Sequence, residues 1–496
     1  MVDAMTMKGV FLVNYIGYII SRNSKISNEQ KIMKIRSIAS QVMVTMISNL
    51  VKFSAGSFIG FAALLLAELS QENSDVKVTK GQLSWFASYF FMAPVGAISF
   101  GLLSHTIGGR VALLIISITL SISSIIFYFA TNSTMILVAQ AFVGLMLSPT
   151  ASIGTTYITE IADPHLRSLL ITSGYLSMSF GMFFVMLMRL FFKWKIIAIV
   201  LLIFPVMGFL GLLFVPNSPY WLARKGRFEE AEVALAWLRG WTTLENVRTE
   251  FLALKESNIK VNSDDTRSQK QSISVLIKSC TQRSLWMPLS ITIYVLIMFD
   301  LVGCNTIKTF NVVIFRKIET PFDIYLAGAI YDGVRIIGGI ICMFCINTLG
   351  KRKLLFISLF GAGTAHIVVA IVVHLIKLEI GNLTYLVWIP PVMIIFASFI
   401  LSMGLEKVTY VLNSEILPNR FREIGMGMGR CLAGLISAMF GQVFLYMVDA
   451  MTLQGVFLFF GINGFIALVT LYFIVPETEG KTLVEIENHF AGKRTT

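Results

Sequence analysis

The sequence predicts an all-α integral membrane protein whose twelve transmembrane helices form two six-helix repeats. Hydrophobic residues make up 56% of the 496-residue chain and charged residues only 14%, whereas about a quarter of the residues of a soluble globular protein are charged. Apolar runs of 18 or more residues recur along the whole length, and each can cross a hydrocarbon core about 30 Å thick. These runs show no strand alternation, and backbone polar groups in lipid must be paired internally, so every span is expected to be helical.

One long polar segment divides the apolar runs into six and six. We therefore expect an N-terminal half at 40–215, a cytosolic helical linker at 216–285 and a C-terminal half at 286–475. Residues 1–39 form an N-terminal segment and residues 476–496 a C-terminal tail, and both are expected in the cytosol. The predicted spans lie at 40–68, 83–104, 110–131, 135–158, 167–190, 194–215, 286–315, 324–347, 353–376, 387–412, 424–447 and 453–475.

Basic residues indicate which side of the membrane each loop occupies. The linker contains eleven Lys and Arg against eight Asp and Glu, and the loops after spans two, eight and ten are also basic. Because cytosolic loops carry an excess of Lys and Arg, we expect these loops, the linker and both termini in the cytosol. The segment with Arg189, Lys193 and Lys195 falls on the other side and is an exception. The net charge of +12 is accounted for in part by these basic loops and does not imply a nucleic-acid partner.

The N-terminal segment contains an apolar stretch, Gly9–Ile20, that is too short to span a bilayer. Three interpretations remain open: an interfacial helix, the apolar region of a signal-like peptide, or sequence upstream of the true start. Met33, just before a basic stretch, is the alternative start in the third interpretation.

The residue pattern does not predict an enzyme, a cofactor or a metal site. Five cysteines lie in or beside spans and form no disulfide framework. Cys342 and Cys345 form a CxxC pair inside a predicted helix, but a structural zinc site needs four ligands. We therefore interpret these two cysteines as small packing residues. The sequence contains no nucleotide-binding loop and no catalytic triad.

Short charged or polar motifs recur at the same ends of equivalent spans in the two groups of six. Three such pairs occur in the same order, which indicates a duplicated six-helix unit. The pairs are GGR (108–110) with GKR (350–352), Glu160 and Arg167 with Glu415 and Arg422, and VPNS (215–218) with VPET (475–478).

The repeated charges lie at the predicted cytosolic ends of spans, where they can stay hydrated. Arginine forks bind carboxylates with two parallel hydrogen bonds, so an Arg–Glu–Arg cluster on each half can tie the two halves together on the cytosolic face. Simple anchoring by positive charge is the alternative, but anchoring does not require the acids. The predicted gating network comprises Arg110, Glu160, Arg167, Arg352, Glu415 and Arg422.

Eight motifs are spread along the chain: SWFAS (84–88), GLLSHTIGGR (101–110), YITEIADPHLR (157–167), PNSPYWL (216–222), GCN (303–305), NTLGKRKLL (347–355), SEILPNRFR (414–422) and PETEGKTLVEI (476–486). Together they resemble the sugar porter family of the major facilitator superfamily, of the glucose-facilitator type. The sequence as a whole is similar to those of insect trehalose facilitators. The resemblance covers residues 40–490. It implies two six-helix halves that rock about a central cavity, with a small-molecule solute bound near the midplane. It also implies a plasma-membrane protein that works as a monomer.

The linker supports this resemblance. Phe228, Ala231, Leu235 and Leu238 follow the PNSPYWL motif at helical spacing. The segment resembles the cytosolic helical bundle of the family.

The cavity departs from the family pattern more than the scaffold does. The family's neutral amides and indoles suit sugars, because amides bind hydroxyls and aromatic faces stack on C–H faces. Here Tyr175 replaces a span-five glutamine, whereas Asn305 in span seven is retained. Phe299 and Asp300 replace the span-seven glutamine pair. The substrate-binding candidates are Tyr175, Asp300, Asn305, Thr309, Arg335 and Tyr410.

Seven ionisable side chains fall well inside predicted spans: Lys52, Asp300, Lys308, Asp332, Arg335, Glu406 and Lys407. Each would cost about 2.5–3.5 kcal/mol if it faced lipid, so most are expected to face a cavity, water or one another. Asp332 and Arg335 are three residues apart and share a helix face. Asp300 and Lys308 are too far apart to touch along a straight helix, so they could pair only if the helix were kinked near Gly303.

Glu406 and Lys407 are adjacent, so we expect them to point in different directions and to find partners on other helices. Three roles remain open for the intramembrane charges: pairing between helices, substrate binding, and proton coupling. Asp300 is the candidate for proton coupling, because a buried acid can change its protonation state.

Three functions remain open for the chain as a whole. The first is facilitative transport of a hexose, trehalose or similar solute by alternating access. The second is proton-coupled transport of a charged organic solute on the same fold. The third is a sensor that binds its ligand without transporting it. Family resemblance favours the first, while the ionic cavity residues favour the second.

Overall fold

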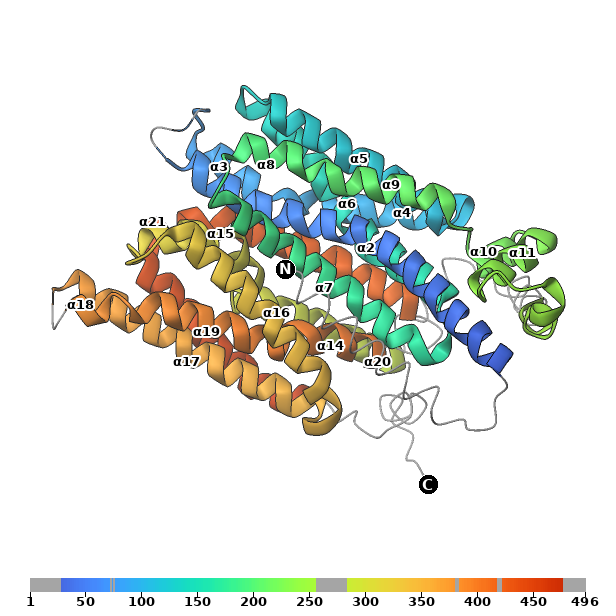
Figure 1. Ribbon diagram of the computed structural model, residues 1–496. Helices are drawn as coiled ribbons and strands as arrows, with labels where there is room; N and C mark the ends of the chain where they lie inside the picture. Colours follow the sequence, from blue (N-terminus) through green and yellow to red (C-terminus); the bar gives the residue numbers. More distant parts are fainter. Residues whose placement is uncertain are drawn as a thin grey trace.

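The computed structural model consists almost entirely of helices that run side by side along one long direction (Figure 1). It describes residues 28–71, 74, 76–255, 283–379, 383–416 and 422–475. Within these residues, eleven helical runs are long and apolar enough to cross a membrane. The last run, Cys431–Ile474, holds two spans, because the backbone breaks at Thr452 with φ 63° and ψ 168°. The eleven runs therefore accommodate the twelve predicted crossings.

Two groups of helices correspond to the two predicted halves. The N-terminal half contains α2 (Asn28–Leu69), α3 (Lys80–Ala87), η1 (Tyr89–Met92), α4 (Ala93–Ile107), α5 (Gly109–Phe129), α6 (Ser133–Ile161), α7 (Pro164–Arg189), α8 (Trp194–Leu201) and α9 (Ile203–Phe214). The linker contributes α10 (Pro219–Arg224) and α11 (Phe228–Leu238). The C-terminal half contains α14 (Arg283–Leu301), α15 (Cys304–Lys317), α16 (Ile324–Leu349), α17 (Lys351–Lys377), α18 (Leu383–Leu386), α19 (Ile389–Met403), α20 (Leu405–Ile416) and α21 (Arg422–Ile474).

The linker helix α11 confirms the helical spacing read from the sequence. Ala231, Leu235 and Leu238 are buried, and Phe228 packs against the same small core. That core is completed by Val247 and other apolar residues of the helical segment 244–255. The linker is therefore a folded unit over its described residues.

Helix α2 begins at Asn28, well before the predicted span boundary at residue 40. The linker explains the difference, because it docks on the first turns of α2. The Ser40 hydroxyl donates a hydrogen bond to the Leu238 carbonyl at 2.7 Å, and Gly240 lies so close that an added Cβ would be 2.6 Å from the Arg36 Cβ. The apolar stretch at Gly9–Ile20 lies outside the described residues.

Two spans of the C-terminal half are broken at glycines. Gly303 adopts the left-handed conformation (φ +88°) between α14 and α15, and an added Cβ would lie 2.8 Å from the Phe460 ring. Gly404 separates α19 from α20, and the amide of the next residue donates to the Ser358 hydroxyl at 2.9 Å. Both breaks leave non-helical backbone within the bundle, where it is buried by protein rather than exposed to lipid.

The duplicated unit is visible in the backbone. Gly108 and Gly350 precede α5 and α17 with nearly the same conformation, φ 88° and ψ 157° against φ 82° and ψ 151°. The arginine that follows each glycine binds a carbonyl at the end of its own half: Arg110 donates to Leu212 at 2.7 Å, and Arg352 donates to Tyr472. Equivalent positions thus make equivalent contacts in the two halves.

Small residues bring α2 and α7 into close contact. A Cβ added at Gly56 would lie 1.9 Å from the Met178 carbonyl oxygen, so only glycine fits without moving a helix. We expect Gly56→Ala to lower stability by about 1–3 kcal/mol through overpacking, although alanine is the better helix former. Thermal unfolding in detergent measures the loss. The control is Gly101→Ala in α4, where an added Cβ meets nothing within 4 Å, and equal unfolding temperatures for the two variants would contradict the prediction.

Candidate functional site

The bundle has two ends that differ in their connections. Helices α10 and α11 mark one end, which we call the linker face, and the opposite end is the outer face (Figure 1). Helices of both halves meet along the bundle: α2 packs on α15, and α16 packs on α7. A solute path between the halves would run from one face to the other.

At the outer face, Glu68 at the end of α2 connects the two halves. It accepts a hydrogen bond from the hydroxyl of Tyr325 on α16, and its carboxylate lies 2.7 Å from Arg189 on α7. The Arg189 guanidinium also stacks over the Tyr325 ring, with 4.3 Å to the ring centre. This pairing explains why a basic residue is tolerated on the predicted outer side.

Two further links join the halves at the same end. Lys80 on α3 forms an ion pair with Asp449 on α21. Arg316 on α15 donates through Nη1 to the Ala67 carbonyl at 2.6 Å and to the Ser70 hydroxyl at 3.0 Å. The sequence identified none of these residues as candidates, although several are charges at span ends.

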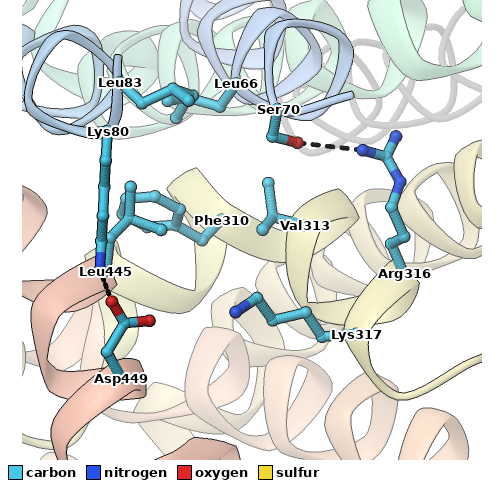
Figure 2. Close-up of a pocket in the computed structure, with 10 residues that line it drawn as sticks. All are labelled: Leu66, Ser70, Lys80, Leu83, Phe310, Val313, Arg316, Lys317, Leu445 and Asp449. Atoms are coloured by element: carbon cyan, nitrogen blue, oxygen red, sulfur yellow. Dashed lines mark hydrogen bonds and ion pairs between the residues drawn. The ribbon is translucent and has the colours of Figure 1, made fainter. Parts of the chain in front are cut away.

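A cavity of about 310 Å³ lies among these links, between the two halves (Figure 2). Its apolar lining includes Phe310, whose ring packs against Phe444 in a tilted arrangement with 4.3 Å between ring centres. Charged side chains surround this apolar lining in Figure 2. The lining residues are Leu66, Ser70, Lys80, Leu83, Phe310, Val313, Arg316, Lys317, Leu445 and Asp449.

An ion cluster lies deeper in the C-terminal half, centred on Arg335. Its Nη2 is 2.8 Å from Glu406 on α20, and its Nη1 is 3.4 Å from Asp332, so the predicted pairing on one helix face is confirmed. Lys407 lies 3.8 Å from Glu406, so the expectation that these neighbours point apart is wrong; the long lysine side chain reaches its neighbour's carboxylate. Arg335 also approaches the sulfur of Met182 on α7 at 3.9 Å, which places the cluster at the boundary between the halves.

Asp300 and Asn305 belong to a separate cluster of hydrogen-bonded polar side chains. The Asn305 amide donates to Asp300 at 3.2 Å and to the Ser437 hydroxyl of α21 at 2.8 Å. Ser437 in turn donates to Asp300 at 2.8 Å. The structure thus brings two candidates together and adds Ser437, which no sequence motif marked. Asp300 forms no ion pair with Lys308 in the described residues.

The remaining candidates lie on α15, in the N-terminal half and on α20. Lys308 is half-buried on α15, within electrostatic range of Arg335 and Glu406, and Thr309 beside it is buried. In the N-terminal half, the Lys52 amine lies 3.3 Å from the Thr155 hydroxyl. It is also 6.0 Å from the centre of the Tyr175 ring. The side chain of Tyr410 lies outside the described part of the chain.

The described members of the predicted gating network make contacts other than the predicted Arg–Glu pairs. Glu160 pairs at 2.6 Å with Arg224 of the linker helix α10. Arg110 and Arg352 bind carbonyls of their own halves, as described above. Arg167 lies in the first turn of α7, and the side chains of Glu415 and Arg422 lie outside the described residues. The contacts recorded for the described members therefore lie within one half or reach the linker.

The chain belongs to the sugar (and other) transporter family, whose family model matches residues 40–490. The facilitated trehalose transporter Tret1 of Drosophila pseudoobscura pseudoobscura is 26% identical over 466 residues, which is 92% of this chain and 52% of the relative. The human solute carrier family 2 facilitated glucose transporter member 6 is 26% identical over 477 residues, covering 91% of this chain and 92% of the relative. The chain thus spans about half the length of the first relative and nearly all of the second.

The fold is also found in solved structures. The inward open conformation of the xylose transporter XylE from E. coli superposes with a TM-score of 0.71 at 18% identity, covering 91% of this chain and 99% of that chain. A partially occluded inward open conformation of the same transporter gives a TM-score of 0.69 at 16% identity. The predicted fold of two six-helix repeats is confirmed.

Proposed function

We propose that the chain carries a sugar or sugar-like solute, of the hexose or trehalose class, across the membrane by alternating access and without energy coupling. The names of the similar trehalose and glucose transporters support the solute class. Family members are transporters rather than enzymes, and the chain is proposed to share that property. A proton-coupled carrier of a charged solute and a non-transporting sensor are the alternatives that the experiments below separate.

One observation carries the proposal: the halves are tied at the outer face. Glu68, Lys80 and Arg316 each bind a residue of the opposite half. At the linker face, Arg110 and Arg352 bind within their own halves. A bundle whose halves are tied together at one face matches one state of an alternating-access cycle.

Polar side chains along the boundary supply groups for hydroxyl binding. The Lys308 amine forms no hydrogen bond or ion pair with the residues that the structure describes, and it is proposed to donate to the solute. Asn305 and Tyr175 are half-buried and present an amide and an aromatic ring. Thr309, Arg335 and Tyr410 are proposed to complete the site, and Asp300 is proposed to position Asn305.

The remaining organisation follows from the same proposal. Residues 40–215 and 286–475 would be the rocking halves, and 216–285 the latch that docks on α2. We place the protein in the plasma membrane with its linker and both termini in the cytosol, because the basic loops lie on that side. Its partners would be the solute and the bilayer, and a monomer would be the functional unit.

Uptake of labelled trehalose and glucose into proteoliposomes at matched internal and external pH tests the function. We expect saturable uptake that Asn305→Ala lowers about tenfold or more, because hydrogen bonds involving a charged group contribute about 1.5–3 kcal/mol. The control is Asn463→Ala, since Asn463 bonds only to the Phe459 carbonyl of its own helix among the described residues. Absence of saturable flux for both sugars would overturn the function. Flux that responds equally to both variants would overturn only the role of Asn305.

A further inference from the structure

The outer cavity carries an excess of positive charge. Three basic side chains line it, Lys80, Arg316 and Lys317, against one acid, Asp449. The acid is already paired with Lys80. Arg316 and Lys317 therefore line the cavity without an acid of their own, because Asp449 is paired with Lys80.

Both of these side chains have unused donors. Arg316 uses Nη1 for the Ala67 carbonyl and the Ser70 hydroxyl, while its Nη2 is buried and has no hydrogen-bond partner in the described part of the chain. Lys317 forms no hydrogen bond or ion pair with the described residues, and Figure 2 shows its amine extending toward the space beside Asp449. Neither side chain is neutralised by an ion pair in the described part of the chain, so an anion in the cavity would be favoured.

The volume of the cavity and its apolar lining residues limit the kind of ligand that it can bind. A volume of about 310 Å³ is near the lower end for small-molecule sites, which start at about 300 Å³. Leu83, Val313 and Leu445 provide an apolar surface. A small molecule with one apolar face and one anionic group matches both parts of the lining.

We propose that the outer cavity binds a small organic anion, whose phosphate, sulfonate or carboxylate group lies at the Lys317 amine, where the charge of Arg316 also acts on it, and whose apolar body rests on Val313 and Leu445. The anion comes from solution rather than from a lipid. The cavity lies between the two halves, and Lys80, Asp449 and Lys317 at its rim are exposed. Charge-assisted bonds from arginine and lysine suit such groups.

The position of the site gives the ligand a consequence for the transport cycle. The walls come from α2 and α3 of one half and from α15 and α21 of the other. The site is therefore complete only while the outer face is closed. A ligand that binds one state better than the other shifts the population toward that state, so the anion holds the outer face closed and slows transport.

Thermal unfolding of the protein in phosphatidylcholine nanodiscs tests binding directly. The probe is phenyl phosphate, with benzyl alcohol as the uncharged match and inorganic phosphate as the match without an apolar body. We expect phenyl phosphate to raise the unfolding temperature saturably, inorganic phosphate to act only at higher concentration, and benzyl alcohol to have no saturable effect. Lys317→Glu should lower the affinity for phenyl phosphate about tenfold, because the new carboxylate and the phosphate carry like charges. The control is Lys377→Glu, an exposed lysine at the end of α17, which should leave the affinity unchanged.

Three results would overturn the proposal. The first is equal affinity for phenyl phosphate in the Lys317→Glu and Lys377→Glu variants. The second is equal stabilisation by phenyl phosphate and benzyl alcohol. The third is loss of phenyl phosphate binding when phosphatidylglycerol is added to the nanodiscs, since a lipid headgroup would then occupy the cavity. Because binding is measured without transport, failure of the sugar-transport function leaves this test valid. If sugar uptake is observed, external phenyl phosphate should slow it in the wild-type protein and in Lys377→Glu but not in Lys317→Glu.

Discussion

Replacing Arg335 by leucine is expected to destabilise the protein by about 3–5 kcal/mol, the usual effect of removing one partner from a buried ion cluster. Arg335 is only 6% exposed, and its removal leaves Asp332 and Glu406 near each other without their shared cation. Lys407 lies farther from Glu406, at 3.8 Å, and can replace only part of the interaction. Denaturant or thermal unfolding in detergent measures the loss.

A charge-matched variant separates electrostatics from packing. Combining Arg335→Leu with Asp332→Asn and Glu406→Gln removes all three charges together. We expect this triple variant to recover most of the lost stability, because a buried cluster replaced as a whole is often nearly neutral. If the single and triple variants unfold at the same temperature, Arg335 contributes by packing and the ion cluster does not stabilise the half.

Glu68→Gln is expected to open the outer face. Glu68 accepts from Tyr325 of the other half and pairs with Arg189, so neutralising it weakens a charge-assisted link across the boundary. Such hydrogen bonds contribute about 1.5–3 kcal/mol, enough to shift the balance between closed and open states about tenfold or more. The readout is the rate at which a membrane-impermeant maleimide labels Val313→Cys, a buried cavity residue, in a cysteine-free background.

The matched control is Glu379→Gln. Glu379 is an exposed acid just beyond the end of α17, and no contact with the other half is recorded for it. Its replacement should leave labelling slow. Equal labelling rates in the two variants would mean that the Glu68 link does not hold the outer face closed.

Much of the fold was predictable because membrane spans are long and uniformly apolar. Hydropathy located the crossings, and the recurrence of GGR at 108–110 as GKR at 350–352 indicated the duplication that the matched backbone angles at Gly108 and Gly350 now show. Tertiary contacts could not be predicted in the same way. The early start of α2 depends on the linker, whose Leu238 carbonyl binds Ser40, and no local pattern records that contact.

The candidate site was predictable only in part. Helix spacing was sufficient to pair Asp332 with Arg335, because both lie on one face of α16. The partner of Arg335 on α20 and the contact between Asn305 and Ser437 join separate helices, so the sequence could name the residues but not the pairs. The links at the outer face were missed for the same reason: charges at loop ends show no periodicity that identifies their partners.

Distances measured between the two halves decide whether the outer face alternates between a closed and an open state. Spin labels at Phe192 and Leu378 report on the outer face, and labels at Thr106 and Leu349 report on the linker face; all four residues are exposed. Pulsed electron paramagnetic resonance in nanodiscs should give two distances for each pair of labels. The state with the long distance at the outer face should be the state with the short distance at the linker face. Added trehalose or glucose should shift both populations together. A single distance at each face, unchanged by either sugar, would contradict alternating access by this protein.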